Sequence, residues 1–475
     1  MKKILFYLLF NSLLFCITIL VIQKGKSLPV KTAVKTMTVA DAPVSGITDA
    51  FNFKTLNDAR SIFLHNLKNP ISLLLLQIIV ILITARVFGS LFKRLGQPTV
   101  VGEIIAGIFL GPSLLGFFCP GLTAFLFPSS SLISLQYLSQ IGLTFFMFSI
   151  GMDLDLKNLS NSKRDAVIIS HTGIAIQFLL GVILAFSYFT QFAPGGISFL
   201  SFSLFMGITM SITAFPVLAR ILQERGLNKT ALGGLAITCA ASDDITAWCI
   251  LAVVIAIVKA GSLLSAGYTI VLAILYIFVM LYLIKPLLEK LSQKHFNKER
   301  VNRHLTALTF LVLLVSAFTA EMIGIHSLFG AFIAGVIMPD DMKFRQSINL
   351  KIEDISKIIL LPIFFAITGL RTQVGLLSGG YLWVVCGIVI LIAVAGKLAG
   401  ITFTSRLLGQ SWKDSVSLGI LMNTRGLMEL VVLNIGYDLG IISPLLFAIL
   451  VLMALATTLM TGPLLNMVNL VFRKR

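Results

Sequence analysis

Long stretches almost free of charge recur along the whole chain and restrict its fold more than any other feature. A helix that crosses a bilayer needs about 20 mostly apolar residues. One N-terminal stretch and thirteen further ones meet this length or approach it, near 4–22, 70–90, 97–115, 131–151, 165–188, 199–219, 231–257, 267–286, 304–322, 325–339, 356–375, 381–404, 414–436 and 443–470. Only 12% of the 475 residues are charged, about half the share in a soluble domain. These features exclude a soluble enzyme, a disordered chain and a fibrous repeat, and predict an all-α polytopic membrane protein with about 13 core helices.

Lysine and arginine gather in alternate loops, which predicts how the chain is oriented. With the loop after the second stretch in the cytoplasm, that side receives the basic clusters at 93–94, 157–164, 220–229, 285–303, 343–357, 406–413 and 473–475. The opposite side keeps little beyond Lys259 and Arg371. The C-terminus is therefore predicted to be cytoplasmic. The net charge of +17 follows this pattern, so no nucleic-acid partner is expected.

The N-terminal region predicts a division of the chain into three parts. Residues 1–22 read as a signal peptide or an N-terminal anchor, because two lysines precede an apolar run. Residues 23–69 form a polar segment that we place outside the cytoplasm, and residues 70–475 form the membrane domain. The five cysteines lack metal-ligand spacing and are odd in number, so we expect small apolar residues in place of disulfides or a metal site.

Two pairs of segments resemble each other across the chain. The sequence at 106–112 is similar to that at 334–339, and 145–152 is similar to 364–370. The offset is about 220 residues, and the matched segments cross in opposite directions by the count above. Inverted repeats of this kind are typical of secondary transporters, whose substrate site lies near the midplane between the repeats.

Charged residues deep in apolar stretches are the strongest functional signal. Asp243 and Asp244 fall near the middle of 231–257, where each charge costs about 2.5–3.5 kcal/mol on an insertion scale. Neighbouring helix positions point about 100° apart, so one carboxylate can face a cavity while the other faces another helix. Lys397, within an equally apolar stretch, supplies a compensating cation. Asp243 and Asp244 are therefore predicted to bind the transported cation and proton.

Two further stretches are predicted to be broken helices. The segment 205–216 contains Ser211, Thr213 and a proline, and the segment with Asn423 and Thr424 follows about 210 residues later in the opposite orientation. Broken helices at matching places expose backbone carbonyls and helix ends to ions.

Arg425 and Glu429 follow directly after the second break. They are four residues apart and can meet on one helix face. We leave open whether they form a structural ion pair or bind ions.

Four motifs together resemble the monovalent cation:proton antiporter-2 family, which has the sodium/proton antiporter fold and includes bacterial sodium or potassium:proton exchangers. They are GEIIAGIFLGPS at 102–113, ITAFPVLAR at 212–220, SDDITAW at 242–248 and NTRGLMEL at 423–430. The resemblance implies a homodimer in the bacterial inner membrane, with a dimerisation domain and a mobile core domain.

The resemblance also implies roles for individual residues. Asp244 would be the essential cation and proton site, Asp243 would occupy a position that is Asn in many relatives, and Lys397 would be its basic partner. Thr213 and Thr424 would mark the crossing stretches. An Asp-Asp pair with a lysine is similar to that of the electrogenic members.

The predicted function is therefore secondary active antiport of Na⁺ or K⁺ against protons, electrogenic and without a cofactor. The alternatives are an organic-anion transporter, which paired carboxylates disfavour, and a cation channel of similar architecture. An aspartyl protease is disfavoured because its dyad needs two carboxylates face to face, which adjacent Asp243 and Asp244 cannot provide. The chain is thus not expected to be an enzyme.

Overall fold

The computed structural model describes residues 2–30, 66, 69–153, 163–227, 230–260, 263–295, 303–339 and 341–473, and all regular elements in them are helical. Thirteen of these helical spans are long and apolar enough to cross a membrane, the first of them near the N-terminus. The remaining twelve and the shorter apolar helix Ser327–Val336 together make up the thirteen predicted core helices. The predicted fold class is confirmed.

The helices follow closely the order that the apolar stretches predict. Those of the first half are α1 (Lys2–Gly25), α3 (Pro70–Arg94), α4 (Thr99–Leu110), α5 (Leu115–Phe118), α6 (Pro120–Leu126), α7 (Ser129–Asp153), α8 (Lys163–Phe192), α9 (Phe199–Ser211), α10 (Phe215–Glu224) and α11 (Ala231–Ala260). Those of the second half are α12 (Leu263–Val279), α13 (Lys285–His295), α14 (Arg303–Ile323), α15 (Ser327–Val336), α16 (Met342–Ile355), α17 (Leu361–Arg371), α18 (Gly380–Leu407), α19 (Trp412–Met422), α20 (Leu427–Asp438) and α21 (Pro444–Arg473). Single π-helical turns join α12 to α13 and α16 to α17.

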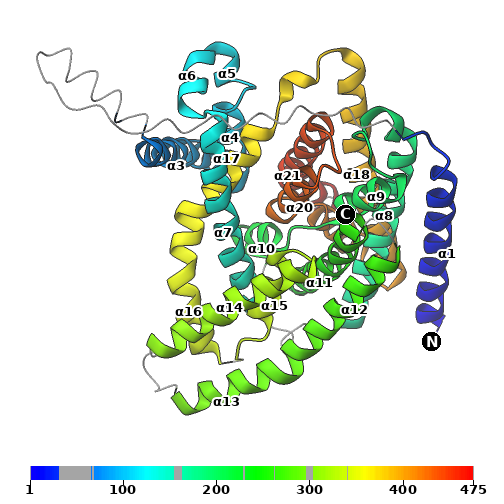
Figure 1. The fold of residues 1–475 in the computed structure, drawn as a ribbon. Helices are drawn as coiled ribbons and strands as arrows, with labels where there is room; N and C mark the ends of the chain where they lie inside the picture. The colour runs from blue at the N-terminus through cyan, green and yellow to red at the C-terminus, as the bar shows by residue number, and fades with distance from the viewer. Residues whose placement is uncertain are drawn as a thin grey trace, which may run out of the picture.

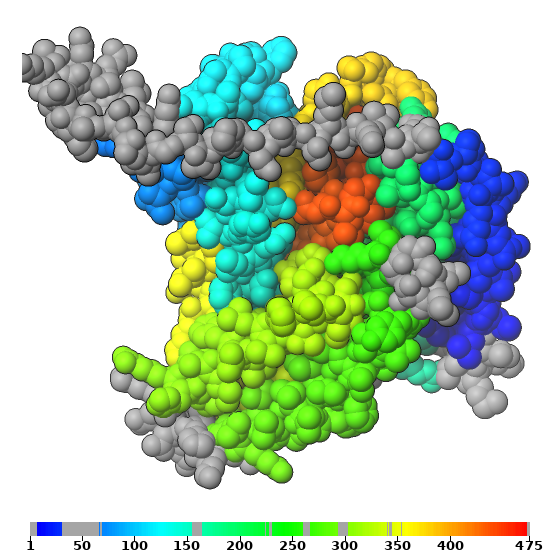
Figure 2. Space-filling model, in the orientation of Figure 1, coloured from blue at the N-terminus to red at the C-terminus, as the bar shows by residue number. Residues whose placement is uncertain are grey.

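Helix α1 stands at one edge of the helical bundle, where it packs against α8 and α9 (Figure 1). In the space-filling view it forms a continuous column along that edge (Figure 2). Most of the predicted polar segment 23–69 lies outside the described residues. The division of the chain at residues 22 and 69 therefore stays a prediction.

The two sequence repeats take part in equivalent helix–helix contacts. Helix α4 packs against α17, and α15 packs against α7. Helix α4 matches α15 in the sequence repeat, and α7 matches α17. The two contacts are therefore equivalent, each joining the first helix of one repeat to the second helix of the other. Glycines allow the close approach in both cases, Gly107 against Gly369 and Gly151 against Gly335. The inverted repeat is thus confirmed.

The glycine contact between α7 and α15 predicts a strong stability effect. The Cβ atom of a Gly335→Ala variant would overlap the Phe148 carbonyl oxygen, and backbone atoms can yield only if the helices separate. We expect a loss of about 1–3 kcal/mol of stability, as for overpacked cores. Gly387→Ala in α18 is the control, because its Cβ would meet nothing within 4 Å. Thermal unfolding in detergent checks this, and equal midpoints for the two variants would contradict it.

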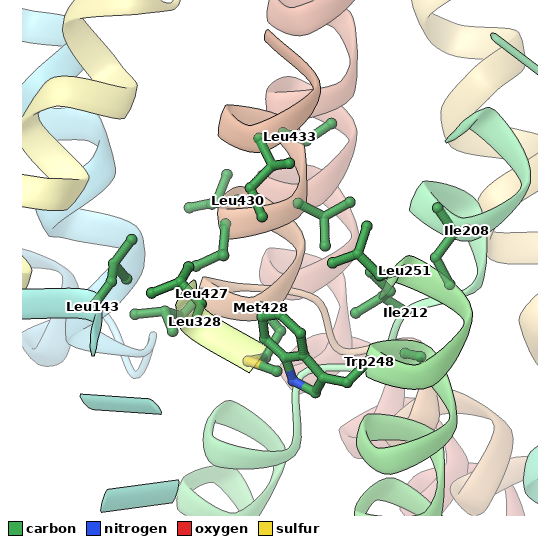
Figure 3. Packing of buried hydrophobic residues seen from close by; sticks show 14 of the residues in the cluster. Leu143, Ile208, Ile212, Trp248, Leu251, Leu328, Leu427, Met428, Leu430 and Leu433 are labelled. Carbon is green, nitrogen blue, oxygen red and sulfur yellow. The ribbon is translucent and has the colours of Figure 1, made fainter. Parts of the chain in front are cut away.

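A large apolar cluster packs between α11 and α20 and reaches α9, α7 and α15 (Figure 3). Trp248 of α11 lies beside Met428 of α20, and both are buried. Leu430 and Leu433, on the following turn of α20, have no exposed surface. The polar centre described next is therefore bordered by close-packed hydrocarbon.

Candidate functional site

Both predicted helix breaks are present, and they contact each other. Helix α9 ends at Ser211 and α10 begins at Phe215, with extended backbone at Ile212 and Ala214. The second break separates α19 from α20. The Ala214 N–H donates to the Thr424 carbonyl over 3.0 Å, so one break is joined to the other through the backbone. The prediction of two broken helices that meet is confirmed.

Asp243 is fully partnered at this crossing. Its carboxylate forms an ion pair with the Lys397 ammonium at 3.0 Å and accepts the Thr213 hydroxyl at 2.6 Å. The Ser170 hydroxyl of α8 donates to the other oxygen at 2.5 Å. Asp243 and Lys397 are each only 1% exposed. A buried ion pair of this kind is tolerated because hydrogen bonds satisfy its remaining lone pairs.

Asp244, the next residue, has a contrasting environment. It is also 1% exposed, but neither carboxylate oxygen has a hydrogen-bond partner. The Phe215 N–H at the start of α10 lies near it, without the geometry of a hydrogen bond. Asn423 at the other break is likewise buried, with both amide atoms unpaired. A carboxylate in such a place is stable only when it is protonated or when a cation binds it.

Ser211 and Thr424 take part in the contacts at the crossing through their backbone carbonyls and not through their hydroxyls. The Ser211 hydroxyl donates to the Gly207 carbonyl of α9, and the Thr424 hydroxyl donates to the Leu421 carbonyl at the end of α19, each over 2.7 Å. The Ser211 carbonyl instead accepts the Lys397 ammonium at 2.7 Å. Of the hydroxyls predicted along the ion path, only that of Thr213 reaches a carboxylate.

Arg425 and Glu429 form a buried ion pair at 3.0 Å, with exposed fractions of 1% and 0%. The guanidinium also donates to the carbonyls of Thr209, at 3.0 Å, and of Met210, at 2.5 Å. These carbonyls are at the C-terminal end of α9, where the helix dipole is negative. Arg425 therefore holds the two breaks together, which favours the structural interpretation.

Sequence reasoning missed Ser170, which contacts Asp243 from α8, and a polar network farther out on α17 and α20. Ser170 lies among ordinary apolar and hydroxyl residues, with no signal that distinguishes it. Arg371 of α17 pairs with Asp438 of α20 at 2.9 Å and donates to Asn434 at 2.8 Å. Asn434 in turn donates to Thr368 at 2.8 Å. We call these four residues of α17 and α20 the Arg371 network.

A cavity of about 690 Å³ leads from the basic end of the molecule to the helix breaks. Phe215, Pro216, Val217 and Leu427 line its inner part, and its outer part is lined by Thr99, Asp153, Arg220, Gln223 and Lys357. On the far side of the breaks, beside the Arg371 network, the recorded cavity measures only about 30 Å³. The large cavity therefore approaches the helix breaks from the basic end of the molecule.

Comparisons with known proteins agree with this geometry. The family model described as "Sodium/hydrogen exchanger, transmembrane" matches residues 78–468. A Synechocystis protein named Na⁺/H⁺ antiporter NhaS4 is 44% identical over 83% of this chain and 97% of its own length. Arabidopsis cation/H⁺ antiporter 17 is 38% identical over 84% of the chain, and yeast K⁺/H⁺ antiporter 1 is 33% identical over 86%. The chain spans about half the length of these two relatives.

A solved structure is similar as well. The sodium proton antiporter MjNhaP1 from Methanocaldococcus jannaschii superimposes with a TM-score of 0.64 over 84% of this chain and 99% of that one. At 16% identity this likeness shows a shared fold.

Proposed function

The chain belongs to the sodium/hydrogen exchanger family, and from this premise we propose that it exchanges Na⁺ or K⁺ for protons by alternating access. The family consists of transporters that need no cofactor, and not of enzymes. The relatives named above are antiporters for Na⁺, K⁺ or unspecified cations. Neither an organic anion nor a channel is named among them.

The observation that carries the proposal is the unpartnered Asp244 carboxylate beside the fully partnered Asp243. Proton and cation would compete for Asp244, because a buried carboxylate needs one or the other. Asn423 and the exposed backbone of the two breaks are available to complete the coordination of the cation. Thr213, in the first break, donates its hydroxyl to Asp243 and to the Met422 carbonyl next to the second break.

A second proton is proposed to come from the Asp243–Lys397 pair. A cation on Asp244 repels the nearby ammonium, which weakens the ion pair and favours loss of a proton from Lys397. Two protons would then exchange for one monovalent cation, and the exchange would be electrogenic. The mobile core would carry the site from one side to the other.

The large cavity supports a state that is open toward the cytoplasm. The N-terminus of α1 lies at the same end as α13, and α5 and α6 lie at the opposite end (Figure 1). This arrangement places the lysines at the start of α1 on the side of the basic loops, as the positive-inside rule requires. We propose a homodimer in the bacterial inner membrane with a cytoplasmic C-terminus, in which residues 70–475 form the antiporter domain.

The direct test is proton flux in proteoliposomes, reported by a pH-sensitive dye and titrated with Na⁺, K⁺ and Li⁺ in turn. Flux that saturates with Na⁺ or K⁺ and moves protons against the cation gradient supports antiport. Cation flux without proton movement would indicate a channel, and labelled organic-anion uptake would indicate the other alternative. Either result would overturn the proposal.

We expect the Arg371 network to hold α17 and α20 together on the outer side of the molecule. Arg371→Ala removes the ion pair and the hydrogen bond that join α17 to α20. We expect faster amide hydrogen exchange in the outer turns of α20, around Asn434 and Asp438, because the opening free energy falls there. Lys259→Ala is the control, since it removes an exposed ion pair with Glu321 on the same side. Equal exchange in both variants would contradict a closing role for the network.

A further inference from the structure

An apolar groove on the outer surface of the bundle has no role in the exchange mechanism. Helices α1, α8 and α18 enclose a space of about 280 Å³. Its walls are formed by Tyr7 and Phe10 of α1, by Ile168, Thr172 and Ile176 of α8, and by the end of α18 around Thr404. The Thr404 hydroxyl donates to the Gly400 carbonyl of its own helix at 2.8 Å. The groove therefore presents mainly hydrocarbon to its occupant.

The groove runs along α8 over a distance similar to the thickness of one leaflet of a bilayer. Its residues on α8, namely Ile168, Thr172 and Ile176, follow one another at four-residue spacing and so form one stripe. Ile176 lies near the middle of α8, which spans Lys163–Phe192. The groove residues of α8 from Ile168 to Ile176 rise about 12 Å, and the helix from Arg164 to Ile176 rises about 18 Å, which brackets the roughly 15 Å of one hydrocarbon leaflet.

A cation lies one helix turn before the groove residues of α8. Arg164 is exposed and continues the same stripe of α8, one turn before Ile168. On α18, Arg406 lies between the groove residues Thr404 and Leu407 in the sequence. It stacks on the exposed ring of Trp412 at 5.4 Å. Tryptophan and arginine are typical of the headgroup depth of a membrane. The end of the groove at Arg164 therefore lies where lipid phosphates are found.

We propose that this groove binds one acyl chain of an anionic phospholipid from the leaflet at the basic face, with its headgroup beside Arg164. A water-soluble ligand would not reach a groove that faces the hydrocarbon, and a neutral apolar molecule would leave the cation unused. The lipid packs against the side of α8 opposite to Ser170, and it contacts α18 at Thr404, two turns beyond Lys397 on the same helix face. It also fills the space between α1 and the rest of the bundle.

Native mass spectrometry of the full chain, purified in detergent and titrated with dioleoyl phosphatidylglycerol or dioleoyl phosphatidylcholine, tests the site. The unmodified protein is expected to retain one phosphatidylglycerol in preference to phosphatidylcholine. Thr404→Phe fills the groove and should remove this bound lipid. Thr319→Phe on α14 is the matched control, because its hydroxyl donates to the Val315 carbonyl in the same way and it lies outside the groove.

The headgroup contact is tested separately with Arg164→Gln. We expect phosphatidylglycerol to bind about fivefold more weakly, as for one basic residue at an anionic surface, while phosphatidylcholine binding is unchanged. Arg303→Gln is the control, since Arg303 is exposed at the start of α14. Retention of the lipid by the Thr404→Phe variant would overturn the groove as the site. An unchanged preference for phosphatidylglycerol in Arg164→Gln would overturn the anionic headgroup.

Discussion

Asp244→Asn is expected to abolish exchange, with proton flux in proteoliposomes at the level of empty vesicles for Na⁺, K⁺ and Li⁺. The substitution keeps the shape of the side chain but removes the charge that binds the cation and the group that takes up the proton. Loss of one partner from a buried charge pair costs about 3–5 kcal/mol, which corresponds to at least about a hundredfold weaker cation binding.

The same variant should remain folded, and this separates a functional loss from a structural one. Asp244 has no hydrogen-bond partner to lose, so its replacement by a neutral amide should leave the unfolding temperature equal or higher. Glu321→Gln is the control, because it removes an acidic side chain from a membrane helix away from the breaks. Cation-driven proton flux that persists in Asp244→Asn would show that the site lies elsewhere.

Lys397→Ala is expected to have the largest effect on stability. It leaves the Asp243 carboxylate buried at 1% exposure with only the hydroxyls of Thr213 and Ser170 as partners. It also leaves the Ser211 carbonyl without the ammonium that it accepts. A broken buried pair costs about 3–5 kcal/mol, so thermal unfolding in detergent should show a marked fall in the midpoint.

A double variant tests the electrostatic origin of this loss. Asp243→Asn combined with Lys397→Met removes both charges and keeps similar volumes, and it should recover much of the stability, because an uncharged pair has no desolvation cost to offset. If the double variant were as unstable as Lys397→Ala, packing around the aliphatic stem of the lysine would explain the loss. An imposed membrane potential should also change the exchange rate of Lys397→Ala less than that of the unmodified protein. An equal response would contradict a charge-carrying role for Lys397.

Much of the candidate site could be predicted because the bilayer makes each misplaced charge or helix breaker conspicuous. Asp243, Asp244 and Lys397 stand out in apolar stretches, and the structure brings the first and third together at 3.0 Å. The spacing of Arg425 and Glu429 indicated that the two side chains can meet, and they pair at 3.0 Å, but Arg425 lies in the break before α20 and so does not share a helix face with Glu429. The contact of Arg425 with α9 was not predictable, because it depends on how two distant helices cross.

The sequence by itself determined the number of crossings, the inverted repeat, the two helix breaks and the identity of the buried charges. These follow from hydrophobic length, local backbone preference and the cost of charge in hydrocarbon, all of which act within one segment. Only the tertiary structure decided that Asp243 is partnered while Asp244 is not, and that Ser170 reaches Asp243 from another helix. It also decided that the Arg371 network joins α17 to α20 and that a large cavity reaches the helix breaks from one side. Hydrogen bonds and cavities of this kind depend on which helices meet and at what depth, and a bilayer allows many such arrangements for the same set of apolar helices.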